Sequence, residues 1–247
     1  MSGTQESYPE LPNIVHLLAE CFPRSFFTFF DRFHHELFSL AVGVLLLTAA
    51  FFATRKTSLV PHSMQNAAEV FVQCVDDFVC SIIGPHGRTY TPFVGTVFIY
   101  ILLMNLIGLI PFMVPATSGL SITLAISLVV FVYVQYTAIS KQGLFGYLYH
   151  LAGKPKGILG VTVVLPLFMF CMHVITEFIR PLSLALRLRS VMWGDDILLA
   201  VIAGFGWVGL PLLVVNMGLA LLTAVVQALV FTLLSTVYLS LAMGHDE

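Results

Sequence analysis

The stretch MHVITEFIRPLSLALRLRSVMWGDDIL, residues 172–198, decides how this chain is interpreted. It is largely apolar, and apolar runs of membrane-spanning length flank it on both sides. Its ionisable side chains are His173, Glu177, Arg180, Arg187, Arg189, Asp195 and Asp196. Ionisable groups at membrane depth are costly, so they usually face protein or a water-filled cavity and mark an ion or proton path. The stretch therefore predicts a charged helix at the centre of a proton-conducting membrane protein.

The composition indicates an all-α polytopic membrane protein with one bundle. The chain has 247 residues, of which 58% are hydrophobic and 10% are charged, whereas a soluble domain carries about 25% charged residues. A net charge of -2 gives no indication of nucleic-acid binding. The four cysteines lack metal-ligand spacing. We expect no metal and no cofactor.

Hydrophobic runs predict a membrane bundle over 37–242. Single spans are expected near 37–54, 93–114 and 120–139, with an amphipathic helix over 63–83 on the inner surface. Residues 1–36 are predicted to form a polar and amphipathic segment on the outer side, and 243–247 a short inner tail.

Arg55 and Lys56 follow the first span directly. The positive-inside rule therefore places the N-terminus outside and the C-terminus in the cytoplasm or matrix. The N-terminus has the pattern of neither a signal peptide nor a transit peptide. A bacterial inner membrane is expected, with the mitochondrial inner membrane as the alternative.

The segment 158–215 is too long for one perpendicular span. Two spans are the default prediction. The alternative is one long, strongly tilted helix, about 158–205, that forms a hairpin with a helix over 208–242.

Helical angles arrange the charged side chains on two sides of the 172–198 helix. At 100° per residue, Glu177, Arg180 and Arg187 fall on one stripe with His173. Arg189 and Asp196 fall on the opposite side and could pair. Two explanations remain open: structural ion pairs that close a bundle, or two polar zones separated by an arginine that cannot lose its proton.

Three motifs resemble subunit a of F-type ATP synthases, the membrane proton-channel subunit. They are RPLSLALRL (180–188), which Asp196 follows nine residues after Arg187, MNLIGLIP (104–111) with Asn105, and VQALVFTLLSTVYLSLA (226–242) with Gln227. The resemblance covers residues 37–242. It favours the tilted hairpin, which in this family faces a rotating ring of c subunits.

The resemblance also implies roles for individual residues. Arg187 matches the essential arginine that faces the proton-carrying carboxylates of the c-ring. The implied inner proton path is His173 with Glu177, the outer path is Asp196 with Asp195, and the supporting polar residues are Asn105, Gln227 and Arg189.

Partners are implied by the same resemblance. They are the c-ring, subunit b of the peripheral stalk, the remainder of the F1Fo complex and the lipid bilayer. The chain would have no catalytic site of its own, because the soluble head makes ATP and only the complex is an H⁺-transporting ATPase.

The chain departs from the family pattern at two places. After the arginine, the family usually continues L-F-G-N or L-x-A-N, whereas this chain has Leu188-Arg189-Ser190-Val191. In the last helix, Ala220 stands where the family usually has Glu or His. We expect Asp195 to compensate for the missing ionisable group.

Two rival functions make different predictions. An ion-coupled secondary transporter predicts inverted repeats, and the sequence has no sign of them. A non-conducting structural subunit predicts that replacement of Arg187 is tolerated.

Overall fold

The computed structural model describes residues 34–54, 63–110, 116–151 and 161–243, and these are almost entirely helical. The elements in chain order are α3 (His34–Thr54), α4 (Ser63–Ile83), η1 (Pro85–Thr89), α5 (Thr91–Ile107), η2 (Ala116–Ser118), α6 (Leu120–Leu151), α7 (Val161–Gly204), η3 (Gly206–Gly209) and α8 (Leu210–Met243). The predicted all-α class is confirmed. Most of the predicted N-terminal segment and nearly all of the inner tail lie outside the described residues.

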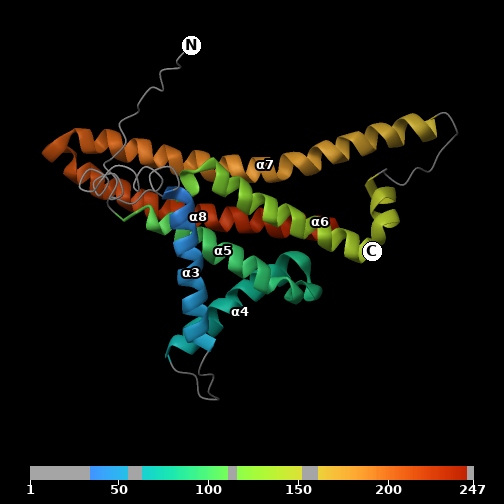
Figure 1. Cartoon of the computed structure of the whole chain (residues 1–247), viewed down its shortest axis with the longest axis horizontal. Helices are drawn as coiled ribbons and strands as arrows, with labels where there is room; N and C mark the ends of the chain where they lie inside the picture. The colour runs from blue at the N-terminus through green and yellow to red at the C-terminus, as the bar shows by residue number, and fades with distance from the viewer. Residues whose placement is uncertain (1–33, 55–62, 111–115, 152–160, 244–247) are drawn as a thin grey trace, which may run out of the picture.

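The long segment forms one helix. Helix α7 has 44 residues, which correspond to about 66 Å at 1.5 Å per residue, more than twice the hydrocarbon thickness of a bilayer. Figure 1 shows α7 and α8 side by side along the long axis of the molecule, whereas α3 runs across that axis. The segment therefore forms one long helix in a hairpin with α8, as in the alternative prediction, and not two separate helices.

The hairpin closes through a tight contact. Gly206 adopts a φ of 60°, a conformation that favours glycine. A Cβ atom at Gly209 would lie 2.5 Å from the carbonyl oxygen of Ile202. The two helices therefore meet at this turn without room for a side chain at position 209.

Two helices differ in length from the sequence prediction. Helix α5 ends at Ile107, before the predicted end at 114. Pro111 disfavours a helical conformation at the preceding residue, and the glycine at 108 already weakens the helix there. Helix α6 continues to Leu151 across a kink at Gly143, which has a φ of 71°. The span predicted for this segment ends at 139.

A core of α5, α6, α7 and α8 side chains fixes the orientation of α7. Leu184 and Leu188 of α7 are 3% and 0% exposed and pack in one cluster with Ile101 of α5, Val130 of α6 and Phe231 of α8. Three described stretches are long and apolar enough to cross a membrane: Leu120–Lys141, Phe168–Gly204 and Gly206–Ala242.

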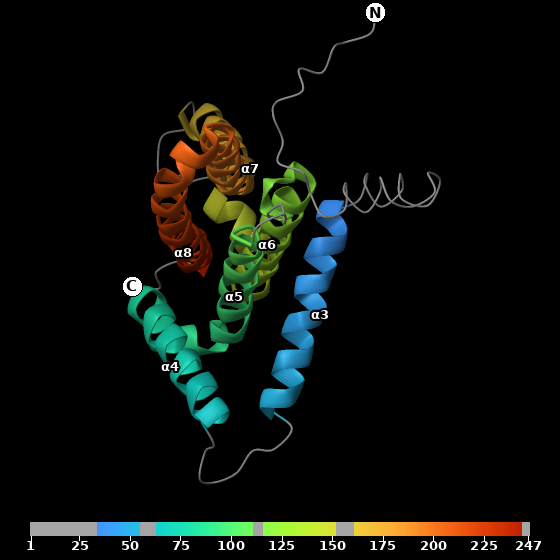
Figure 2. The same ribbon diagram turned by 90° about the vertical axis from the view of Figure 1, so that its left-hand side faces the viewer.

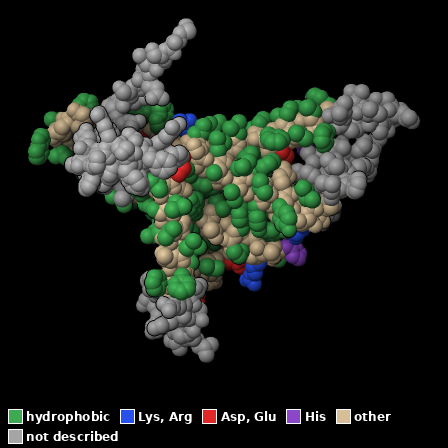
Figure 3. Space-filling view, in the orientation of Figure 1, with side chains coloured by type: hydrophobic (Ala, Val, Ile, Leu, Met, Phe, Trp, Pro, Cys, Tyr) green, Lys and Arg blue, Asp and Glu red, His purple; other side chains and the backbone are tan. Residues whose placement is uncertain are grey.

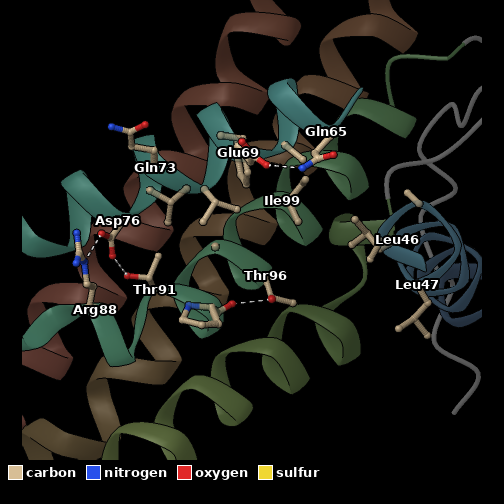
Figure 4. A pocket seen from close by; sticks show the side chains of 18 residues that line it. Leu46, Leu47, Gln65, Glu69, Gln73, Asp76, Arg88, Thr91, Thr96 and Ile99 are labelled. Carbon is tan, nitrogen blue, oxygen red and sulfur yellow. Dashed lines mark hydrogen bonds and ion pairs between the residues drawn. The ribbon is translucent and has the colours of Figure 1, made fainter. Parts of the chain in front are cut away.

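Helix α4 is amphipathic, as predicted. Its Val75 and Val79 are buried together with Val94 of α5. Figure 2 shows α3 and α4 diverging from their linked ends. A hollow of about 1170 Å³ lies between α3, α4 and α5, and Figure 4 shows its lining side chains. None of the predicted site residues lines this hollow.

Candidate functional site

Arg187 lies on the open face of α7. Its side chain is exposed, although Leu188 beside it is fully buried. It lines a hollow of about 360 Å³, together with Ile179, Leu182, Ser183, Leu186 and Ser190. Within the described ranges the ion pairs are Arg88–Asp76 and Arg180–Glu177, so Arg187 has no ion-pair partner there.

The face around Arg187 is apolar and uncovered. Exposed large side chains of α7 and α8 include Phe178, Ile179, Leu182, Leu186, Leu219, Leu222 and Val226. On the face of the molecule that Figure 3 draws, charged side chains are likewise sparse. Apolar surface of this extent marks contact with lipid or protein. An unpaired cation within it requires an anionic partner.

Glu177 and Arg180 form a paired cluster towards the N-terminal end of α7. Arg180 Nη1 donates to Glu177 Oε1 over 2.7 Å, and Gln135 Nε2 of α6 donates to Glu177 Oε2 over 3.0 Å. The guanidinium carbon of Arg180 lies 5.1 Å from the ring centre of Tyr238 on α8. These contacts join three helices.

A cavity of about 10 Å³ adjoins this cluster. Its lining includes Glu177, Arg180, Tyr238 and Ser127. This volume is close to the smallest that can hold one water molecule. The cluster therefore combines a structural ion pair with space for one solvent molecule.

His173 is partly exposed, and its Nδ1 lies 2.8 Å from the carbonyl oxygen of Met169. A carbonyl only accepts hydrogen bonds, so Nδ1 carries the hydrogen and Nε2 is the acceptor nitrogen of the neutral ring. Glu177 lies one turn further along α7, but its hydrogen bonds go to Gln135 and Arg180.

The predicted outer residues lie in the C-terminal third of α7. Asp195, Asp196 and Arg189 are each half-buried. Arg189 takes part in neither of the ion pairs between described residues. The side chains of Arg189 and Asp196 originate about 10 Å apart along the helix.

Asn105 forms the interhelical hydrogen bonds expected of an amide in an apolar helix. It is 1% exposed. Its Nδ2 donates to the carbonyl oxygen of Ala224 on α8 over 3.3 Å, and its Oδ1 accepts from Thr117 Oγ1 over 2.8 Å. Gln227 is also buried, at 6% exposed. Ala220, on α8 with Gln227, is half-buried.

Sequence reasoning missed three residues of these networks. Gln135 and Thr117 supply hydrogen bonds to Glu177 and Asn105, and Tyr238 supplies the ring beside Arg180. Gln135 carried a weak signal, because a polar amide in a membrane-length helix needs a partner. Thr117 and Tyr238 are ordinary in composition, and only the packing of helices reveals their roles.

The charged residues thus fall into three groups along one long helix: the paired cluster with His173 nearby, the unpaired Arg187, and the half-buried acids near the hairpin turn. In the described part of the chain, no group of three or more His, Cys, Asp or Glu side chains could hold a metal ion.

Comparison with known proteins identifies the family. The ATP synthase A chain model matches residues 37–240. An ATP synthase subunit a from Protochlamydia amoebophila is 41% identical over 97% of this chain and 91% of its own length. Relatives of the same name from Bdellovibrio bacteriovorus and Moorella thermoacetica are 34% and 36% identical, over 84% and 83% of this chain and 88% of each relative. The chain belongs to the ATP synthase A chain family.

Proposed function

We propose that this chain conducts protons through two offset half-channels and, through Arg187, couples proton movement to rotation of a c-ring in an F-type ATP synthase. Family membership implies assembly within the F1Fo complex. The observation that carries the proposal is the position of Arg187: a permanently charged group, exposed on an apolar face and without an ion-pair partner in the described part of the chain.

The chemistry of arginine suits this position. The guanidinium group keeps its proton at any physiological pH. A neutral carboxylic acid that arrives from a partner loses its proton when it meets this cation, because the ionised form is stabilised there. The same cation blocks direct proton passage between the two sides. Lysine would be a leakier barrier, because it can lose its charge when desolvated.

The inner half-channel is assigned to His173 and Glu177. The Nε2 atom of His173 is an acceptor, since Nδ1 donates to the carbonyl oxygen of Met169, and histidine is a common proton relay. Glu177 borders a cavity that can hold about one water molecule. A proton released near Arg187 can leave on this side.

The outer half-channel is assigned to Asp195 and Asp196. Both are half-buried near the hairpin turn, at the opposite end of α7 from the inner group. A proton that enters there neutralises a ring carboxylate, which can then face lipid without the cost of a bare charge. Each elementary charge that crosses the membrane supplies about 2.3 kcal/mol per 100 mV.

The partners and location follow as parts of the proposal. The c-ring is assigned to the open face of α7 and α8, and subunit b of the peripheral stalk is a further partner. The proposed location is a bacterial inner membrane. Arg55 and Lys56 favour an inner position for the end of α3, with the N-terminus outside and the C-terminus inside.

ATP-driven proton pumping in membrane vesicles tests the assignment. The Arg187→Ala variant is expected to lose pumping although the complex assembles. The Arg189→Ala variant is the matched control, because Arg189 lies on the same helix and also lacks an ion pair among the described residues. It is expected to retain pumping.

Other outcomes contradict the proposal in different ways. Loss only in Arg189→Ala would mean that the wrong arginine has been assigned. Pumping in both variants would exclude the mechanism and favour a structural role for the chain. The amount of assembled complex, measured in the same vesicles, separates loss of coupling from loss of assembly.

A further inference from the structure

The carboxylate of Glu177 has two hydrogen-bond partners of different chemistry. Arg180 Nη1 donates to Glu177 Oε1 over 2.7 Å, and Gln135 Nε2 donates to Glu177 Oε2 over 3.0 Å. Each carboxylate oxygen therefore has its own donor, one from α7 and one from α6. Only 21% of the Glu177 side chain is exposed, so its charge depends on these donors more than the charge of a solvated group would.

The two partners respond differently when Glu177 takes up a proton. A guanidinium group has only donors and keeps its proton, so Arg180 stabilises the ionised form alone. A glutamine amide has an NH₂ group that donates and a carbonyl oxygen that accepts. When the amide of Gln135 turns over, its Oε1 atom takes the place of Nε2 and can accept from a protonated carboxyl group. Of the two partners, Gln135 is therefore the one that can stabilise either form of Glu177.

Arg180 keeps a favourable contact when Glu177 is neutral. Its guanidinium carbon lies 5.1 Å from the centre of the Tyr238 ring. At this distance a cation is attracted to the face of an aromatic ring. Neutralisation of Glu177 therefore does not leave the charge of Arg180 in wholly apolar surroundings.

Titratable groups from two helices face Glu177 in the described part of the chain. Arg180 and, one turn earlier, His173 lie on its own helix. Helix α8 contributes Tyr238 to the cavity of about 10 Å³ that adjoins Glu177. Helix α6 contributes uncharged side chains to this cavity: Ser127, Val130, Phe131 and Val134. The cavity can hold about one water molecule, which can bring a proton to the carboxylate.

We propose that Gln135 is a positioning residue of the inner half-channel, whose amide holds Glu177 in both of its protonation states. This inference rests on the proposed function and adds a residue of α6 to it. Nε2 donates to the ionised carboxylate. When a hydrated proton reaches Glu177, one O–H bond forms on the carboxyl group and one breaks in the hydrated proton. The amide then turns, and Oε1 accepts from the new hydroxyl group. Arg180 keeps its proton throughout, and Gln135 neither gains nor loses one.

The alternative is an interhelical hydrogen bond with a structural role only. Polar side chains of membrane helices commonly pair across helices, and the bond between Gln135 and Glu177 does join α6 to α7. This alternative predicts that any loss of pumping follows the amount of assembled complex. The positioning role predicts a loss of pumping per complex.

Gln135→Met is the first test, with ATP-driven proton pumping in vesicles as the measurement. Methionine is unbranched and of similar length, so it fills the same space without the amide. Pumping per assembled complex is expected to fall about tenfold, as for the loss of one hydrogen bond to a charged group. Tyr136→Phe is the matched control, because it removes a polar group from the next residue, which is 70% exposed. It is expected to pump normally. Normal pumping per complex in Gln135→Met would overturn the inference.

Infrared difference spectroscopy provides a second test, which a purely structural role would not affect. Spectra of the intact complex at about pH 8 and pH 4 are compared, because carboxyl groups gain protons across this range. The C=O band of a protonated carboxyl group that is missing in Glu177→Gln belongs to Glu177. In Gln135→Met this band is expected at higher wavenumber, because the protonated group has lost its hydrogen-bond acceptor. In Tyr136→Phe it is expected to stay in place.

Two infrared results would overturn the inference, even if Gln135→Met pumps poorly. One is a Glu177 band at the same wavenumber in Gln135→Met and in the unaltered complex, since the amide would then not bind the neutral acid. The other is the absence of any Glu177 band, since Glu177 would then take up no proton.

The same variants separate this inference from the proposed function. If Arg187→Ala abolishes pumping while Gln135→Met pumps like Tyr136→Phe, the inference alone is wrong. If Arg187→Ala pumps normally, the proposed function is wrong and the role of Gln135 in an inner half-channel is lost with it.

Discussion

Arg180 and Arg187 lie on the same helix, seven residues apart, and differ in almost every other respect. Arg180 has 22% of its side chain exposed and is held by Glu177 at 2.7 Å and by the ring of Tyr238. Arg187 is exposed, and its described surroundings supply no ion pair. Seven residues make nearly two turns, so the two begin at nearly the same helical angle. Sequence spacing alone therefore does not decide which arginine is structural.

Neighbouring helices decide the difference. Near Arg180, α6 supplies Gln135 to the cluster and α8 supplies Tyr238. Near Arg187, the hollow is lined only by α7 residues such as Ser183 and Ser190. An arginine that is already neutralised stabilises the bundle, whereas one on an open apolar face must be neutralised from outside the chain. The comparison assigns the coupling of proton movement to rotation to Arg187. It assigns to Arg180 a structural role that holds the helices together.

The largest effect is expected from Arg187→Lys. Lysine keeps the charge but can lose its proton when desolvated, and it lacks the planar fork that matches a carboxylate. ATP-driven pumping per assembled complex should fall at least about tenfold. The matched variant Arg180→Lys should change pumping little, because a lysine can still pair with Glu177.

Equal losses in these two variants would break the comparison, since both arginines would then act in coupling. Quantification of assembled complex in the same membranes is the necessary control. A loss in Arg180→Lys that follows the amount of complex would indicate a structural effect only.

A smaller effect, on assembly, is expected from Arg180→Met. It leaves the half-buried carboxylate of Glu177 without its cation, and removing one partner of such a pair is destabilising. The amount of assembled complex should fall several-fold, as expected for a loss of about 1–2 kcal/mol. Immunodetection of the chain in washed membranes measures this amount.

The double variant Arg180→Met/Glu177→Leu sharpens the interpretation. Replacing both charges by apolar groups is often neutral for stability, so assembly should recover. Pumping that recovers with it would remove Glu177 from the proton path, whereas assembled but inactive complex would support the inner half-channel. A double variant that assembles no better than Arg180→Met would contradict the stabilising role of the pair.

Much of the fold was predictable, because the lengths of the apolar runs and the positions of the charged residues indicate where the helices lie. The bounds of α4 agree with the predicted amphipathic helix, since Val75 and Val79 repeat at helical spacing. The early end of α5 depended on local chemistry at Gly108 and Pro111, which a hydropathy pattern overlooks. The sequence alone did not decide between two spans and one long helix. Pro181 and Gly194 are residue types that often interrupt helices, yet α7 continues through both.

The site was predictable in its residue types and less so in its contacts. Periodicity placed Glu177 and Arg180 on one face, where they pair. It placed Arg187 on the same stripe, but the structure leaves it on the uncovered side, because Leu184 and Leu188 take the core positions beside it. Asp76 lies on the amphipathic helix α4, and Arg88 and Thr91 donate hydrogen bonds to its carboxylate. The spacing of residues along one helix does not predict which partners other helices supply.

Asp195→Asn is expected to have an intermediate effect on pumping. Asp195 is half-buried near the hairpin turn, and Ala220 offers no ionisable group on α8. Pumping should fall beyond what the amount of assembled complex explains, because a proton-transferring group is lost, but by less than in Arg187→Lys, because Asp196 can partly replace that group. Normal pumping per complex would restrict the outer path to Asp196.

The smallest effect is expected at the junction of α4 and α5, where the carboxylate of Asp76 accepts from Thr91 Oγ1 over 2.7 Å and from Arg88 Nε over 2.9 Å. These hydrogen bonds, from Thr91 first and Arg88 second, lower the pKa of Asp76 below its usual value of 3.8. A lowered folded-state pKa means that the stabilisation is complete above the unfolded-state pKa and is lost only as pH falls through the folded-state value.

Asp76→Asn should therefore lower the thermal midpoint of the complex only slightly, because Arg88 is largely exposed and such pairs are weak. The difference in thermal midpoint between the Asp76→Asn variant and the unaltered chain, measured on intact complex in vesicles, should stay constant between pH 8 and 5 and shrink only below about pH 4. Taking the difference cancels the acid sensitivity of the other subunits. A difference that already shrinks between pH 7 and 5 would mean that Asp76 has a raised pKa and is not held by these two donors. Unlike Arg187, Asp76 already has its partners within the chain, so its removal should alter stability and leave pumping per complex unchanged.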